Sequence, residues 1–155
     1  MTANILHFPA PELRECPDCE RETACRSVQA RAFEYGVGKD HVALQADVPV
    51  WTCTTCGYAF GDGEGEDAEH EAVCRHFGLL TPREIVELRA QLGLTQIALA
   101  ALTGLGEASI KRWEAGTVLQ NQAADNLLRL CADQVSRLAL QRIARERLVE
   151  KEVRI

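Results

Sequence analysis

The sequence predicts an α+β fold, in which a small antiparallel β domain is followed by an all-α domain. Two Cys-x-x-Cys pairs, "CPDC" (16–19) and "CTTC" (53–56), enclose a stretch with the pattern of β-strands. A glycine-rich acidic stretch, "FGDGEGEDAEHE" (60–71), comes next, and the remaining residues repeat apolar side chains at helical spacing. A chain of 155 residues has room for two such small domains.

Composition divides the chain into four segments. Residues 1–14 are expected to form a disordered tail that contains prolines, and residues 15–60 the β domain. In that domain "CRSVQARAFEYGV" and "DHVALQADVPVWTC" flank "GVGKD", which predicts a hairpin. Residues 61–78 are expected to be an acidic linker with a short helix from about Asp67 to Phe77. Residues 79–155 form the helical domain.

The two Cys-x-x-Cys pairs indicate one structural zinc site per chain. Each pair places two thiolates around one tight turn, and two such turns complete the tetrahedron that Zn²⁺ prefers. Two unrelated buried cysteine pairs, or dithiol redox chemistry, are the alternatives, although the βαβ context typical of a redox pair is missing. The expected ligands are Cys16, Cys19, Cys53 and Cys56. Cys25 could be a spare ligand, and Cys131 is expected to be a small buried apolar side chain. Cys74 could form a second site with His70 and His76, but a solvated helix is the favoured interpretation of that stretch.

The first helix of the all-α domain is predicted by its capping residues. Thr81 is a suitable N-cap, Pro82 suits the first helical position, and Glu84 completes a capping box. The stripe that faces the core then consists of Ile85, Leu88 and Leu92.

Two short helices follow, joined by a turn that contains glycine. Thr95 caps the first of them, which closes at Gly104, and the second runs from about Glu107 to Ala115. Such a pair is typical of a helix-turn-helix, whose second helix lies in the major groove of DNA. A small helical bundle with ordinary surface Lys and Arg is the alternative.

The charge of the chain is divided unevenly. Residues 1–80 hold 6 Lys+Arg and 14 Asp+Glu, a net charge of −8, whereas residues 81–155 hold 11 and 9, a net charge of +2. The mildly basic second half is therefore compatible with DNA binding, and the acidic first half with a basic partner or with solubility alone.

The stretch "LRAQLGLTQIALAALTGLGEASIKRWEAG" (88–116) resembles the Xre-type, phage-repressor-like helix-turn-helix family. Together with the two Cys-x-x-Cys pairs and "GLLTPREI" (78–85), it makes roughly residues 14–135 similar to MqsA-type antitoxins. That resemblance implies a zinc-binding N-domain that neutralises a toxin, and a C-domain that dimerises and represses its own operon.

The resemblance also implies roles for single residues. Arg112 matches a position that reads bases, and Gln96 one that contacts a backbone phosphate. Ala108 stands where the best-known readers carry Asn, which predicts a different operator, and Glu107 could accept from cytosine N4 or merely cap the helix. The DNA-binding candidates are Gln96, Glu107, Ala108, Ser109, Lys111 and Arg112.

Arg89 and Glu114 match a partly buried ion pair of phage-repressor-like domains and are expected to fix the recognition helix without touching bases. Two solvated charges are the alternative. The apolar stripe of the last helices is expected to form a dimer surface through Leu127, Leu130, Leu138 and Ile143, although Leu127 could belong to the monomer core.

These observations favour a cytoplasmic repressor and antitoxin rather than an enzyme, because no nucleophile–base set or cofactor loop is present. The expected partners are a palindromic double-stranded operator, a small basic toxin of the ribonuclease kind and a second copy of the chain, but no membrane. The alternative is a zinc-containing Xre-type regulator without a toxin, which responds to metal or redox state.

Overall fold

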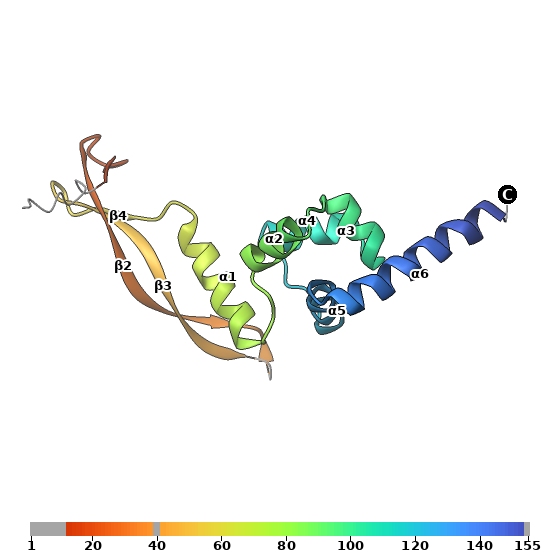
Figure 1. The fold of residues 1–155 in the computed structure, drawn as a ribbon. Helices are drawn as coiled ribbons and strands as arrows, with labels where there is room; N and C mark the ends of the chain where they lie inside the picture. Colours follow the sequence, from red (N-terminus) through yellow and green to blue (C-terminus); the bar gives the residue numbers. More distant parts are fainter. Residues whose placement is uncertain (1–11, 39–40, 154–155) are drawn as a thin grey trace, which may run out of the picture. The chain divides into compact units, whose positions relative to one another are not determined.

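The computed structural model describes residues 12–38 and 41–153, which form two compact units (Figure 1). The first unit ends at Glu69 and the second begins at His70. An antiparallel sheet occupies the first unit and helices dominate the second, so the α+β prediction is confirmed.

The sheet has four antiparallel strands in sequence order: β1 (Leu13–Glu15), β2 (Glu22–Tyr35), β3 (Val42–Cys53) and β4 (Ala59–Phe60). The long β2–β3 hairpin stands where the alternating pattern predicted it, and curves along its length in Figure 1. The first strand was not predicted, because Leu13 and Arg14 were assigned to a disordered tail. They pair instead with β2 across a turn. Residues 1–11 of that tail lie outside the described residues.

The helix α1 (Glu64–His76) begins earlier than the expected start at Asp67. Acidic residues in its first turn suit the positive end of the helix dipole, and Glu64 forms an ion pair with Arg26 of β2. Gly65 lies against β3, where an added Cβ would stand 2.8 Å from Val48 Cγ1. Most of the stretch expected to be a linker is therefore helix.

Five helices build the second unit: α2 (Pro82–Gln91), α3 (Gln96–Thr103), α4 (Glu107–Glu114), α5 (Gln122–Ala132) and α6 (Gln134–Val153). Both hydrogen bonds of the expected capping box are present, since Thr81 Oγ1 accepts from Glu84 N–H and Glu84 Oε2 from Thr81 N–H. The core is formed by residues of α2–α5, chiefly Ile85, Leu99, Ile110, Trp113 and Leu128.

A buried carboxylate ties α5 to the residues before α2. Asp125 is fully buried, and its Oδ1 accepts from Leu80 N–H at 2.7 Å and from Gln120 Nε2 at 3.1 Å. Arg129 Nε donates to Asp125 Oδ2 at 2.6 Å. Burial alone would raise the pKa of Asp125, but these hydrogen bonds outweigh it and lower the pKa.

No single helix in the described residues is long and apolar enough to cross a bilayer. The helices α2 and α3 would be long and apolar enough only if they were joined into one, and the bend between them is 87°.

Candidate metal centre and nucleic-acid interface

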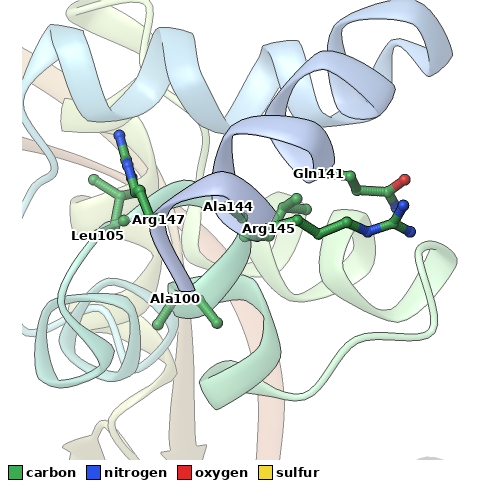
Figure 2. A pocket seen from close by; sticks show the side chains of 9 residues that line it. Ala100, Leu105, Gln141, Ala144, Arg145 and Arg147 are labelled. Carbon is green, nitrogen blue, oxygen red and sulfur yellow. The ribbon is translucent and has the colours of Figure 1, made fainter. Parts of the chain in front are cut away.

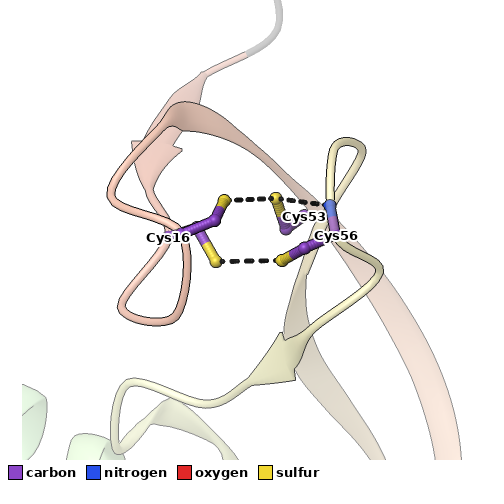
Figure 3. Close-up of side chains that lie close together, drawn as sticks. Cys16, Cys53 and Cys56 are labelled. Carbon is purple, nitrogen blue, oxygen red and sulfur yellow. Dashed lines mark hydrogen bonds between the residues drawn. The ribbon is translucent and has the colours of Figure 1, made fainter.

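Four cysteine thiols meet at one end of the sheet (Figure 3). Cys16 and Cys19 follow β1, Cys53 ends β3, and Cys56 lies in the turn before β4. All four Sγ atoms lie within 4.8 Å of one another. The Sγ atoms of Cys16 and Cys56 are 3.6 Å apart, as are those of Cys19 and Cys53. Tetrahedral zinc with Zn–S bonds of about 2.3 Å spaces its sulfurs about 3.8 Å apart, so the cluster fits such an ion.

The hairpin register explains how two pairs so far apart in the sequence meet. Ala24, at the start of β2, pairs with Cys53, at the end of β3. Thr54 N–H also donates to Thr23 O at 3.1 Å. The hairpin thus brings Cys53 and Cys56 back beside the turn that holds Cys16 and Cys19, just before β2.

The two turns that carry the cysteines are alike. Glu20 N–H donates to Cys16 O at 2.9 Å, and Gly57 N–H donates to Cys53 O at 3.0 Å. Both donors have positive φ, 56° for Glu20 and 77° for Gly57. Among the described residues, Glu20 is the one non-glycine with this conformation. The turn geometry therefore places Glu20 where glycine would be unstrained.

Hydrogen bonds prepare Cys53 to be a thiolate. Thr23 Oγ1 lies 3.3 Å from Cys53 Sγ, and the N–H groups of Thr55 and Cys56 donate to the same sulfur at 3.4 and 3.5 Å. The bond to Thr23 and these backbone bonds lower the pKa of Cys53 to about 5.

The pKa of Cys56 is shifted in the opposite direction. A backbone hydrogen bond at Tyr58 lowers the pKa of Cys56, but burial and the bonds to the other thiols outweigh it and raise the pKa to about 12. Neighbouring thiolates repel each other, which keeps their titrations apart. A divalent cation would remove this repulsion, so the donor set suits a metal site.

A second cluster, not predicted from the sequence, braces the strands next to the thiols. The guanidinium of Arg14 lies 4.3 Å from the ring centroid of Trp51 and donates to Asp62 Oδ2 at 2.7 Å. Trp51 is only 1% exposed, and its Nε1 donates to the same oxygen at 2.9 Å. These contacts hold β1, β3 and the segment after β4 together.

The other cysteines lie outside the thiol cluster. Cys25 is half-buried on β2, whereas Cys74 and Cys131 are fully buried. Burial raises the pKa of both buried thiols, that of Cys74 to about 11. In the part of the chain that the structure describes, no second group of three or more ligand-type side chains comes together.

The helices α3 and α4 are two short helices that a tight turn joins (Figure 1). Gly104 ends α3 in the left-handed conformation, with φ of 78°, and Gly106 is the N-cap of α4. Ile110 and Trp113 anchor α4 in the core. The turn chemistry and the apolar spacing thus position α4 with one face inward.

The DNA-binding candidates lie on or beside the outer face of that pair. On α4, Glu107, Ala108, Lys111 and Arg112 are exposed, and Ser109 is half-buried. Gln96 starts α3 and is half-buried. The structure therefore leaves four of the α4 candidates accessible and Gln96 partly covered.

Arg89 and Glu114 form a bidentate ion pair between α2 and the end of α4. Arg89 Nε lies 2.6 Å from Glu114 Oε1, and Arg89 Nη2 lies 2.8 Å from Glu114 Oε2. The side chains are 21% and 6% exposed, respectively. Gln96 Nε2 also donates to Glu114 Oε2 at 2.8 Å, a contact the sequence did not predict. The amide nitrogen of Gln96 is thus hydrogen-bonded to the ion pair.

The three leucines and one isoleucine expected at a dimer surface differ in burial. Leu127 is half-buried, whereas Leu130, Leu138 and Ile143 are exposed. Leu138 is 58% exposed, and Val135 on the same helix 76%. In this single chain several apolar side chains of α6, Val135 and Leu138 among them, therefore face solvent.

The family model described as "Antitoxin component of bacterial toxin-antitoxin system, MqsA" matches residues 14–139. A search of curated proteins finds no match. The family match covers most of the chain and includes both the thiol cluster and the helices α3 and α4. This chain therefore belongs to the MqsA family of antitoxins.

Proposed function

We propose that this protein is a zinc-containing antitoxin that binds its own operator as a dimer and neutralises a toxin through its N-terminal unit. The observation that carries the proposal is that one antitoxin-family match contains both a four-thiol cluster and the two short helices α3 and α4. The N-terminal unit supplies the thiols and the acidic charge, and the helical unit supplies the exposed face of α4.

Zinc is proposed to be held by Cys16, Cys19, Cys53 and Cys56. Four thiolates fill the tetrahedron and leave no open coordination position, so the ion would stabilise the fold rather than activate water. The two turns and the hairpin register supply the geometry, because they bring the sulfurs together.

DNA binding is proposed for the exposed face of α4. Lys111 and Arg112 are exposed there, and Arg112 is the residue proposed to read bases. One short helix reads few base pairs, so a dimer on half-sites about 34 Å apart is proposed. The exposed apolar side chains of α5 and α6, Leu130 and Leu138 among them, are the proposed contact between copies.

Toxin binding is proposed for the N-terminal unit because of its charge. Residues 1–80 carry a net charge of −8, which would speed encounter with a basic protein. A ribonuclease is the proposed toxin, because a surface that binds RNA is typically basic. If the chain repressed an operator but protected cells from no protein encoded beside it, it would instead be a regulator without a toxin.

The DNA-binding proposal is tested by Arg112→Ala, with Arg83→Ala as the matched control. Arg83 is an exposed arginine of α2 outside the proposed surface. Arg112→Ala should weaken binding to the upstream operator by about 1–3 kcal/mol in a gel-shift titration, and Arg83→Ala should leave it unchanged. Equal affinities for both variants and the parent chain would remove Arg112 from the reading surface.

A further inference from the structure

A groove lies between the end of α3 and the second half of α6 (Figure 2). Its volume is about 510 Å³. Ala100 and Leu105 line it from the α3 side, and Ala144 from α6. All of its α6 residues lie after residue 139, where the family match ends. The groove therefore depends on a part of α6 that the family match does not cover.

Two arginines flank the apolar lining of this groove. In Figure 2 Arg147 extends beside Leu105, and Arg145 extends beside Gln141, with Ala144 between them on the helix. Arg147 reaches the turn of the helix-turn-helix, since a Cβ added at Gly104 would lie 2.9 Å from Arg147 Nη1. Both arginines are exposed. By contrast, Arg142 on the same helix is paired with Glu146 and does not line the groove.

An apolar lining with cations on both sides complements a molecule that has an apolar body and an anionic end. The cavity volume lies in the range of about 300–1,000 Å³ that is common for small organic ligands. On α6 the lining extends only from Gln141 to Arg147, a rise of about 9 Å, which is short for docking of an amphipathic helix. An arginine is also well suited to carboxylate, because its guanidinium can donate two parallel hydrogen bonds.

We infer that this groove binds a small amphipathic organic anion, such as a medium-chain carboxylate. The carboxylate would be held by Arg145 or Arg147, and the chain would lie on Ala100, Leu105 and Ala144. The site would lie against the turn that precedes the recognition helix. Its occupancy does not depend on the proposed DNA or toxin partners.

The test uses the full-length protein, with the fluorescent sulfonate 8-anilinonaphthalene-1-sulfonate as the bound probe and decanoate as the competitor. The probe should bind at one site per chain and be displaced by decanoate, but not by decylamine, acetate or inorganic phosphate. The Arg145→Ala/Arg147→Ala variant should bind the probe about tenfold more weakly or worse, and Ala144→Phe should fill the groove and abolish binding. Arg142→Ala is the matched control and should bind like the parent chain.

Other outcomes overturn the inference. Binding that survives the double arginine variant, or that decanoate does not reduce, would place the probe elsewhere. Displacement by phosphate or duplex DNA, but not decanoate, would assign the two arginines to nucleic acid. Loss of the probe as protein concentration rises would show that a second copy fills the groove. Circular dichroism of each variant confirms that it is folded, and the surface arginine variants keep the test valid should Ala144→Phe not fold.

Discussion

At the scale of single residues, Glu114 links three elements of the helical unit. It accepts from Arg89 of α2 and from Gln96 of α3, while it belongs to α4 itself. Burial alone would raise the pKa of Glu114, but these hydrogen bonds outweigh it and lower the pKa. The carboxylate is therefore held charged and joins the end of α4 to α2 and α3.

Glu114→Gln should destabilise the helical unit by about 3 kcal/mol, because it leaves the charge of Arg89 without its carboxylate partner. A double-mutant cycle with Arg89→Met, read by thermal unfolding, should show strong coupling, and additive losses would contradict the buried pair.

The depressed pKa of Glu114 also predicts a pH dependence. Stability from this group should be fully present above the unfolded value of about 4.3 and be lost as pH falls through the lower folded value. Glu114→Gln should lack that part of the acid sensitivity.

The backbone conformation of Glu20 leads to a separate prediction. Its backbone has φ of 56°, a conformation that costs an ordinary L residue about 1–2 kcal/mol. Glu20→Gly should therefore stabilise the metal-loaded N-terminal unit by about 1 kcal/mol in thermal unfolding. Glu20→Ala is the control and should give no such gain. An equal gain from alanine would assign the effect to the lost charge instead of the backbone.

At the scale of elements, the last helix, α6, exposes apolar side chains to solvent. Val135 and Leu138 of α6 are exposed, although the opposite side of the helix contacts α3 and α5. Burial of such side chains against a second copy would remove apolar surface from water. The structure thus leaves α6 with an apolar surface that the proposed dimer would use.

Leu138→Glu should therefore convert the dimer to a monomer in analytical ultracentrifugation, because it places a charge in the proposed contact. Gln91→Glu introduces a charge at the exposed end of α2 and is the control that should remain dimeric. A Leu138→Glu chain that still sediments as a dimer would place the contact between copies elsewhere.

At the scale of the whole molecule, what the sequence could predict was set by local chemistry. Caps such as Thr81, stop residues such as Gly104 and the spacing of the thiols are local signals, so the helices and the cysteine cluster could be predicted. β1 could not, because its three residues form a strand only through pairing with β2.

Other contacts between distant residues were also beyond the sequence, and the Arg89–Glu114 pair could be expected only from the family resemblance. Nothing local links Arg14 to Asp62, or Gln96 to Glu114. Asp125 does leave a signal, since it shares the helical spacing of the buried Leu128 and Cys131 and has Arg129 four residues later. A lone acid on an apolar stripe indicates a buried polar network.

We propose that a metal-stapled unit for the toxin and a metal-independent unit for DNA share one chain. Removal of the metal tests this proposal. Zinc content, circular dichroism, operator binding and capture of the protein encoded beside this gene are all measured on the full-length chain. We predict one zinc per chain, whose chelation abolishes the β signal and the capture of that protein but leaves the helical signal and the operator affinity unchanged. A chain that keeps its β structure without metal, or that loses operator binding together with zinc, would contradict the account.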